Sequence, residues 1–236
     1  MDARVRLSGA AMLIGEPSRA AMLWSLMGGE SRPASELAML ANVSPQTASN
    51  HLRLLLDGGF VKAAAMGRNK FYRLGSSAVA AALESLAVAV HAKPANQGIA
   101  QHSAPELVFA RTCYDHLAGE LGVAMLARLR DEDCLKQRSS EYRLTPRGQE
   151  FLHQLGVDVA GAQAMRRRFA YPCLDWSQRV PHLGGALGAA LLDWLLRSRV
   201  VVRREASRAV RLTRNGQQQL GRLFEIRLTR AGAIAH

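Results

Sequence analysis

The second half of the sequence repeats itself, and this duplication limits the folds open to it more than any other feature. Three blocks recur in the same order: FARTCYD (109–115) as FAYPCLD (169–175), HLAGELGVAML (116–126) as HLGGALGAALL (182–192), and LTPRGQEFL (144–152) as LTRNGQQQL (212–220). The offset grows from 60 to 68 residues, mostly because WSQRVP (176–181) is inserted in the second copy. Three matching blocks in one order are hard to obtain by chance, so two copies of one structural unit are expected.

Each copy is predicted to fold in the same way. An apolar helix covers 116–130 in the first copy and 182–197 in the second, and a hairpin with basic residues follows. A second helix begins at LTPRG or LTRNG, where Thr145 or Thr213 caps it and Pro146 suits the first helical position. Helix, two strands and helix make a reduced winged-helix pattern.

The charge of the chain favours an anionic partner. Among 236 residues there are 31 Lys and Arg against 19 Asp and Glu, so the formal net charge is +12. Residues 1–92 contribute +3 and the remainder contributes +9. Such a balance is typical of nucleic-acid binding, with an anionic membrane surface as the weaker alternative. A hydrophobic content of 48% excludes wholesale disorder and leaves enough apolar material for a core.

Export and membrane insertion are not expected. The N-terminal stretch reaches Glu16 and Pro17 before a signal-peptide core can develop. The longest apolar stretch, at 180–192, is Gly-rich and shorter than the roughly 20 residues of a membrane span. The odd number of cysteines, three, argues against a disulfide framework. A reduced, cytoplasmic setting is therefore the expectation.

Residues 34–59 predict a helix-turn-helix. The segment ASELAMLANV (34–43) reads as a short helix with Leu37 and Leu40 on one side. Ser44 then serves as an N-cap with Pro45 at the first helical position, and a second helix runs to the glycine pair at 58–59. Two short helices joined by a tight turn are typical of a DNA-binding module.

The second of these helices separates an apolar side from a polar one. At about 100° per residue, Ala48, Leu52 and Leu55 point inward. The opposite face carries amide, hydroxyl and guanidinium groups that can read base edges, and a wing hairpin around 67–69 offers cations to phosphates. The predicted DNA-binding residues are Ser44, Gln46, Thr47, Ser49, Asn50, Arg53, Arg68, Lys70 and Arg73. His51 leans toward the packed side and is interpreted as structural.

The first 90 residues or so resemble the arsenic-repressor-like (ArsR/SmtB) family of winged-helix regulators. LIGEPSRAAMLWSLM (13–27) resembles the family's opening helix pair. NVSPQTASNHLRLLLDGGFVKAAAMGRNKFYRL (42–74) resembles its recognition helix and wing, including Ser-x-His-Leu at 49–52 and Gly-Arg at 67–68. The resemblance implies a homodimer that binds an operator with inverted-repeat symmetry, represses a promoter and leaves the DNA when an effector binds.

The ligand sites of the family's metal sensors do not match this sequence. Such sensors commonly carry Cys-x-Cys before the recognition helix, whereas SELAMLANV (35–43) contains no cysteine. The helix predicted at 76–92, which the resemblance identifies as the dimer helix, offers only Glu84 and His91. An effector site is therefore expected elsewhere, in the second half.

The duplication reproduces two kinds of reactive residue. Cys113 corresponds to Cys173, each with an Asp two residues later, and His116 corresponds to His182, each predicted to open a helix. If the repeats face each other about a local two-fold axis, two thiols and two imidazoles converge in a set that suits a soft metal ion. The alternatives are thiol redox sensing, an organic effector, or plain packing of buried cysteines and helix-starting histidines.

Three further features belong to this half. Trp176 and Trp194, with the apolar helix faces, are candidates to line an organic effector pocket, although aliphatic stripes are more often core. Cys134 has no counterpart in the second copy, which has Val there, and is expected in the core. The Arg-rich run 197–214 is either a phosphate- or effector-binding element or a solvated hairpin.

These observations predict a mainly α protein with small β hairpins (α+β). A winged helix-turn-helix for DNA binding and dimerisation spans 1–92, a linker spans 93–105, and a C-terminal sensing domain spans 106–236, with repeats at 106–160 and 165–230. No organic cofactor is indicated, and a soft metal ion is the inorganic candidate.

The function expected is that of a DNA-binding transcriptional regulator, a homodimeric repressor released by a soft metal, an oxidant or a small organic effector. One alternative is a thiol-dependent enzyme built on the duplicated half. It is not favoured, because the chain has no nucleotide loop, nucleophile elbow or paired-carboxylate signature. Another alternative is an architectural DNA-binding protein without a ligand response.

Overall fold

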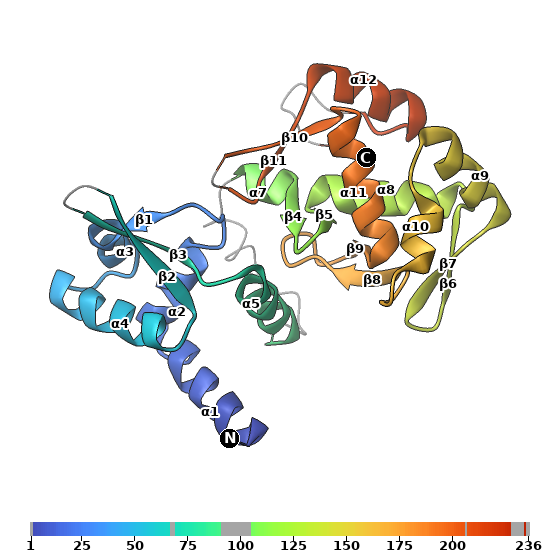
Figure 1. Ribbon diagram of the computed structural model, residues 1–236. Helices are drawn as coiled ribbons and strands as arrows, with labels where there is room; N and C mark the ends of the chain where they lie inside the picture. The colour runs from blue at the N-terminus through green and yellow to red at the C-terminus, as the bar shows by residue number, and fades with distance from the viewer. Residues whose placement is uncertain (1, 67–68, 91–104, 206, 228–233, 235–236) are drawn as a thin grey trace. The chain divides into compact units, whose positions relative to one another are not determined.

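The computed structural model describes residues 2–66, 69–90, 105–205, 207–227 and 234. The chain forms two compact units, Met1–Glu84 and Ser85–His236, and each is described by itself (Figure 1). Residues 93–104 of the predicted linker and 228–230 of the second repeat lie outside the described residues. Pro105, the last linker residue, begins a helix. None of the helices in the described part combines the length and hydropathy that a membrane span requires.

The N-terminal unit is a winged helix-turn-helix. Its elements are α1 (Ala3–Ile14), α2 (Pro17–Ser25), β1 (Arg32–Pro33), α3 (Ala34–Leu40), α4 (Pro45–Asp57), β2 (Val61–Met66) and β3 (Asn69–Leu74), and α5 (Ser77–Val90) continues into the second unit. The strands form an antiparallel sheet in the order β1-β3-β2, with Val61 opposite Leu74 and Met66 opposite Asn69. The predicted helix pair and wing are confirmed, while β1 was not predicted from the sequence.

A compact core holds α2, α3 and α4 together. Its fully buried side chains are Met22, Leu23, Leu26, Leu37, Ala48, Leu52 and Leu55. The inward positions predicted for α4 are thus confirmed. The prediction for α3 was partly wrong: Leu40 is 51% exposed, and Ala38 is buried beside Leu37 instead. Ala34 and Ala41 also pack against the core, so the buried face of α3 lies on the side of Leu37 away from Leu40.

The segment LIGEPSR connects α1 to α2 through one arginine. Glu16 caps α2 by accepting hydrogen bonds from the backbone N–H groups of Ser18 and Arg19. The Arg19 guanidinium donates to the carbonyl oxygens of Leu13 (2.7 Å) and Met12 (2.8 Å). These carbonyls end α1 and have no partner within the helix, so the arginine satisfies them and fixes the corner.

The C-terminal unit is built from two copies of one motif. After α7 (Pro105–Phe109), the first copy comprises β4 (Arg111–Cys113), β5 (His116–Ala118), α8 (Glu120–Asp131), β6 (Leu135–Arg138), β7 (Glu141–Leu144) and α9 (Pro146–Leu155). After α10 (Val159–Ala164), the second comprises β8 (Tyr171–Leu174), β9 (Pro181–Gly184), α11 (Ala186–Arg197), β10 (Val201–Arg203), β11 (Val210–Leu212) and α12 (Arg214–Leu223). Both copies thus run hairpin, helix, hairpin, helix (Figure 1).

The predicted starts of the histidine-led helices were wrong. His116 and His182 lie in strands β5 and β9, and the helices begin only at Glu120 and Ala186. The residues before them, Gly119 and Gly185, have φ of 85° and 93°, a left-handed backbone that breaks strand from helix. Because the strands are three or four residues long, the sequence carried no alternating pattern to reveal them.

The predicted caps of the later helices are confirmed in both copies. The Thr145 hydroxyl accepts a hydrogen bond from Gly148 N at 3.0 Å, and Thr213 does the same for Gly216 N at 2.8 Å. A Cβ at Gly148 would lie 2.2 Å from the Cys134 carbonyl oxygen. The glycine of LTPRG and LTRNG therefore lets the helix approach the preceding strand.

The two copies interlock. Tyr142 N in the first copy donates to Ala170 O before the second, and Val210 N in the second donates to Ala110 O before the first. Helix α8 packs on β9, and α11 packs on β5, so each helix covers the hairpin of the other copy. One shared core results, with Leu121, Leu126, Leu129, Leu187, Leu191, Leu195 and Cys134 among its buried members. The two copies therefore form a single compact unit rather than two separate domains. The expected α+β class is confirmed.

Candidate functional sites

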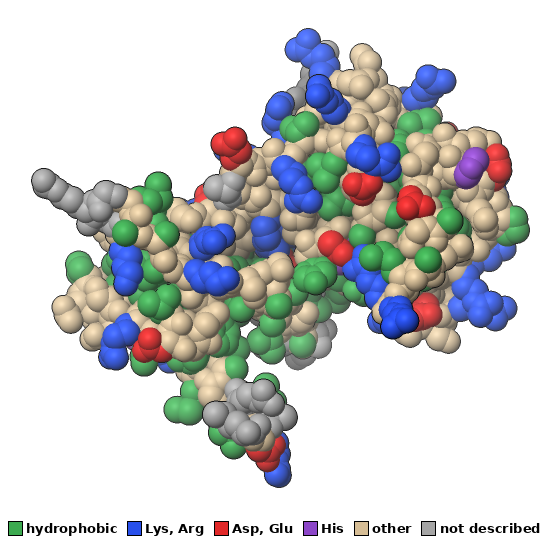
Figure 2. Space-filling view, viewed as in Figure 1, with side chains coloured by type: hydrophobic (Ala, Val, Ile, Leu, Met, Phe, Trp, Pro, Cys, Tyr) green, Lys and Arg blue, Asp and Glu red, His purple; other side chains and the backbone are tan. Residues whose placement is uncertain are grey.

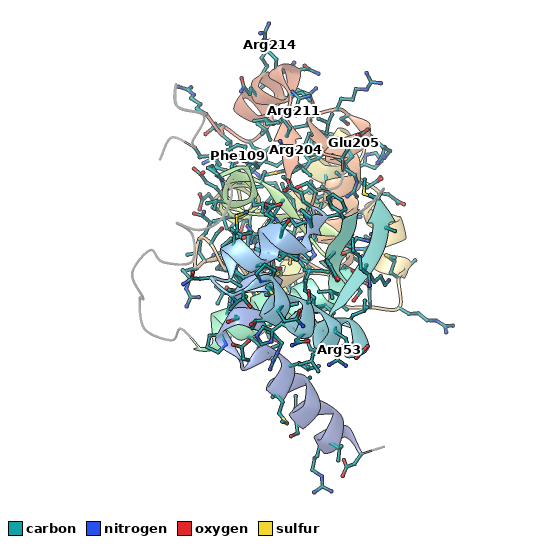
Figure 3. The ribbon with its side chains drawn as sticks, turned by 90° about the vertical axis from the view of Figure 1, so that its left-hand side faces the viewer. Arg53, Phe109, Arg204, Glu205, Arg211 and Arg214 are labelled. Carbon is teal, nitrogen blue, oxygen red and sulfur yellow. The ribbon has the colours of Figure 1, made fainter. Side chains whose placement is uncertain are left out.

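The first candidate site is the exposed face of α4. Gln46, Asn50 and Arg53 are exposed, and the three core residues of the same helix are fully buried on its other side. Arg53 is labelled in Figure 3. Amide and guanidinium groups on one face of a short helix can form paired hydrogen bonds with adenine and guanine in a major groove.

The hydroxyl groups at the start of α4 form hydrogen bonds within the protein. Ser44 is the N-cap, and its Oγ accepts from Thr47 N at 3.1 Å and lies 2.8 Å from the Thr47 hydroxyl. The Ser49 hydroxyl donates to the Pro45 carbonyl oxygen at 2.9 Å. Ser44 and Ser49 are exposed and Thr47 is half-buried, so these groups border the polar face and also hold its first turn in shape.

His51 is half-buried, as its projection predicted. Its Nδ1 lies 3.2 Å from an Arg19 guanidinium nitrogen, and its Nε2 lies 3.6 Å from a Glu16 carboxylate oxygen. Burial tends to raise the pKa of Glu16, but the N–H groups it caps and His51 outweigh burial and lower it. His51 therefore ties the recognition helix to the start of α2.

The wing presents cations on both faces. Lys70 and Arg73 are exposed on β3, three positions apart, so their side chains leave opposite faces of the strand. Lys62 lies directly across from Arg73, an additional cation that the sequence argument did not include. Arg68, the third predicted cation of the wing, lies outside the described residues. Figure 2 shows Lys and Arg side chains spread over the visible face of this unit.

The second candidate site is the Cys-His cluster of the C-terminal unit: Cys113, His116, Cys173 and His182. The structure brings the four together, and their ligand atoms all lie within 4.8 Å of one another. Each hairpin supplies one pair, because Cys113 is the strand partner of His116 and Cys173 the partner of His182. No disulfide links any of the chain's cysteines. The two imidazoles meet edge to edge, with 3.2 Å between their Nε2 atoms.

Glycines make this close meeting feasible. Gly188 on α11 faces His116, and a Cβ there would lie 3.1 Å from His116 Cβ. Gly122 on α8 faces His182 in the equivalent way, at 3.5 Å. Each helix therefore lets the histidine of the other copy pass close to its backbone.

Each histidine has a carboxylate at its other nitrogen. His116 Nδ1 lies 3.3 Å from Asp115 Oδ1, and His182 Nδ1 lies 3.1 Å from Asp175 Oδ2. Sequence reasoning noted these aspartates but gave them no role. The signal was present, since an Asp follows each Cys by two residues in both copies.

Asp175 is the centre of a buried polar network. Its carboxylate accepts from Gly119 N (2.7 Å), from the Ser177 hydroxyl (2.7 Å) and from the Arg111 guanidinium (3.0 Å). Arg111 is fully buried, stacks on the Trp176 ring at 4.5 Å and also donates to Leu107 O. Arg111 was not predicted, and the second copy has Tyr171 in its place, so the repeat held no signal for it.

The network sets the ionisation of its members. Burial alone would raise the pKa of Asp175, but the His182 imidazole 3.1 Å away and the charge of Arg111 hold that pKa well below its usual range. Burial would lower the pKa of His182, yet Asp175 and the neighbouring Cys113 raise it. A charged carboxylate therefore stands behind His182.

The remaining predicted residues are mostly packed. Trp194 is buried in the C-terminal core against Phe224, and Trp176 is buried beneath Arg111. Cys134 is 2% exposed in the same core, as expected, and burial raises the pKa of its thiol. Glu84 is buried, and His91 lies outside the described residues.

The Arg-rich hairpin borders a pocket of about 650 Å³. Phe109, Val210 and Leu212 form part of its apolar lining, and Arg203, Arg204 and Arg211 contribute cations. Figure 3 labels several of these side chains at one end of the unit, with Arg214 beyond them. Arg204 is paired with Glu106. Glu106 and Glu205 also line the pocket, so it combines an apolar wall with charged groups of both signs.

Comparison with known proteins relates both halves of the chain to regulators. The family described as "Helix-turn-helix domain" matches residues 14–62. The HTH-type transcriptional regulator YdfF of Bacillus subtilis is 42% identical over 208 residues, which is 87% of this chain and 91% of YdfF. An alignment of that length extends well beyond the N-terminal unit.

Solved structures match a smaller share of the chain. HlyU from Vibrio cholerae is 24% identical, with a TM-score of 0.34, over 36% of this chain and 94% of HlyU. NolR from Sinorhizobium fredii is 23% identical, with a TM-score of 0.35, over 38% of this chain and 89% of NolR.

Proposed function

The chain belongs to the HTH-type transcriptional regulators, with a winged helix of the ArsR/SmtB kind, and we propose that it is a homodimeric, cytoplasmic repressor. In this proposal the N-terminal unit binds an operator, and an effector bound by the C-terminal unit releases it. The observation that carries the proposal is the polar face of α4, where Gln46, Asn50 and Arg53 are exposed opposite a fully buried apolar side. The net charge of +12 suits the same partner.

Dimerisation is supported by exposed apolar side chains on α1. Val5, Leu7 and Met12 are 60%, 72% and 74% exposed, and Figure 2 shows hydrophobic side chains on this helix. An apolar surface of this kind calls for a partner, and a second copy of the chain is the one that a two-fold operator requires. We expect an inverted repeat with half-sites about one helical turn, or a multiple, apart.

Effector sensing is assigned to the Cys-His cluster. A ligand releases a repressor only if it binds the DNA-incompetent state more tightly. The cluster joins side chains from both copies, so a ligand there acts on the packing of the whole C-terminal unit. A soft metal ion, an oxidant and a small organic molecule are the effector classes to compare.

Arg53→Ala tests the recognition surface. Loss of a paired hydrogen bond to guanine is expected to weaken operator binding by about 1–3 kcal/mol, roughly 5- to 150-fold, and to relax one position of the site. The measurement is a mobility-shift titration against the operator, selected from random DNA, and against a scrambled duplex.

Arg143→Ala is the matched control, since Arg143 is exposed on β7 and its loss changes the net charge equally. It is expected to retain operator specificity. If Arg53→Ala bound the operator as tightly as the parent does, and scrambled DNA as tightly as the parent does, the assignment of α4 as the recognition surface would be refuted. A footprint covering a single half-site would refute the dimer.

A further inference from the structure

The geometry points to a tetrahedral site for a thiophilic divalent metal ion, with Zn²⁺ as the expected ion, held by the thiolates of Cys113 and Cys173 and the Nε2 atoms of His116 and His182. This inference rests on the proposed function, because it names the effector class of the C-terminal unit. The metal-binding step itself is independent of DNA and is tested without it.

The spacing of the ligand atoms fits such an ion. With Zn–N bonds of about 2.0–2.1 Å, two nitrogens of a tetrahedral site lie about 3.3 Å apart. The two Nε2 atoms are 3.2 Å apart. With Zn–S bonds of about 2.3 Å, the sulfurs of such a site lie about 3.8 Å apart. Since all four ligand atoms are within 4.8 Å of one another, shifts of about 1 Å close the site.

The two imidazoles are arranged as ligands. A carboxylate beside each Nδ1 favours the proton on that nitrogen, which leaves a lone pair on each Nε2. The two Nε2 atoms lie 3.2 Å apart, so the lone pair of at least one is directed at the other ring, and a metal ion between them can take up both. Metal-bound histidines in proteins almost always have such a partner at the far nitrogen, which orients the ring and raises its basicity. Asp115 and Asp175 take this part.

The donor set selects the class of ion. Two sulfurs and two imidazole nitrogens favour zinc and similar soft ions, whereas Mg²⁺ and Ca²⁺ require oxygen ligands. Oxidation to a disulfide would use only the thiols of Cys113 and Cys173. It would not account for the close approach of the His116 and His182 imidazoles. Four protein ligands complete the coordination shell of a tetrahedral ion and leave no position for substrate. Such closed sites are typical of structural rather than catalytic zinc.

Access and consequence follow from burial. Cys113, His116 and His182 are buried, and Cys173 is half-buried, so the ion reaches the site beside Cys173. Because the ligands come from β4–β5 in one copy and β8–β9 in the other, the ion crosslinks the two copies. Binding to the folded state alone also raises the stability of this unit.

The test is a titration of the full chain, stripped with a chelator and kept reduced, with Co²⁺ as the spectroscopic probe and Zn²⁺ as the competitor. We expect one ion per chain, the visible bands of tetrahedral Co²⁺ and a thiolate-to-cobalt charge-transfer band, all removed by Zn²⁺. Cys173→Ser is expected to weaken binding by about 100-fold or more. Asp115→Asn, which leaves all four ligands in place and changes a partner of His116, is expected to weaken it by about 10-fold.

Cys134→Ala is the matched control, because Cys134 is a buried cysteine of the same unit outside the cluster. It is expected to bind as the parent does, and circular dichroism checks that each variant is folded. Absence of binding by the parent, an octahedral spectrum, or unchanged binding by Cys173→Ser would each overturn the inference.

The proposed metal site and the proposed repressor function are refuted by different results. If Co²⁺ and Zn²⁺ bind as expected but the operator complex survives, the sensing role is wrong and the metal site stands. If another agent releases the operator and the parent binds no metal, the metal site is wrong and the repressor stands.

Discussion

The two copies of the C-terminal motif have the same backbone but different surroundings at their aspartates. In the second copy, Asp175 is fully buried and accepts hydrogen bonds from backbone groups, Ser177 and Arg111. In the first, Asp115 is 35% exposed and is paired with His116 and Arg167. The second copy therefore positions its histidine with a buried carboxylate, and the first copy positions its histidine with a carboxylate at the surface.

A single insertion explains the difference. The first copy turns directly from Cys113 to His116, whereas the second inserts WSQRVP (176–181) between Asp175 and His182. That insertion supplies Trp176, which covers Arg111, and Ser177, which donates to the carboxylate. The carboxylate of the second copy is buried beside the longer loop, whereas its counterpart in the first copy is accessible to solvent.

The sharpest way to break this comparison is Asp175→Asn. The amide keeps the shape but removes the charge opposite Arg111 and turns an NH₂ group toward other donors. Breaking a buried ion pair costs about 3–5 kcal/mol. We expect a loss of that size in the unfolding free energy of the C-terminal unit, measured by urea denaturation with a chelator present.

Asp115→Asn is its control in the other copy. Since Asp115 is partly exposed, we expect a loss below about 1 kcal/mol. Equal losses for the two variants would show that the insertion did not create a distinct anchor.

A smaller effect is expected from filling the glycines that let the histidines approach. A Cβ at Gly188 would lie 2.3 Å from the Leu183 carbonyl oxygen and 3.1 Å from His116 Cβ. The equivalent distances at Gly122 are 2.6 and 3.5 Å. Overpacking costs about 1–3 kcal/mol, so Gly188→Ala and Gly122→Ala should both destabilise, the first more. Thermal unfolding compares them, and a gain in stability at either position would contradict the close approach.

The smallest effect sharpens the comparison where the copies are alike. Thr145 and Thr213 cap equivalent helices with the same hydrogen bond. Thr145→Ala and Thr213→Ala should each cost about 1 kcal/mol, the usual contribution of an N-cap. Urea denaturation of the two variants should give losses that agree within error. A difference above about 1 kcal/mol would mean that the copies differ in their helices as well as in their aspartates.

Much of the N-terminal unit could be predicted because its signals are local. Ser44, Pro45 and the glycine pair at 58–59 mark the ends of α4 within a few residues, and the 3.6-residue period separates Gln46 and Arg53 from Leu52. Capping and periodicity act between neighbours along the chain, so a sequence carries them directly. Leu40 was misplaced because three small residues, Ala34, Ala38 and Ala41, form the buried face of α3 with Leu37, and their weak hydrophobicity did not mark it.

In the C-terminal unit the sequence by itself determined the duplication, and with it that Cys113 and His116 have counterparts. Only the tertiary structure decided that the four residues meet, that Asp115 and Asp175 stand behind the histidines, and that Arg111 is buried. A lone arginine in a sequence is normally a surface charge, and strands of three residues have no measurable period. Such features depend on pairing between segments about 60 residues apart, where packing of one copy against the other sets the geometry.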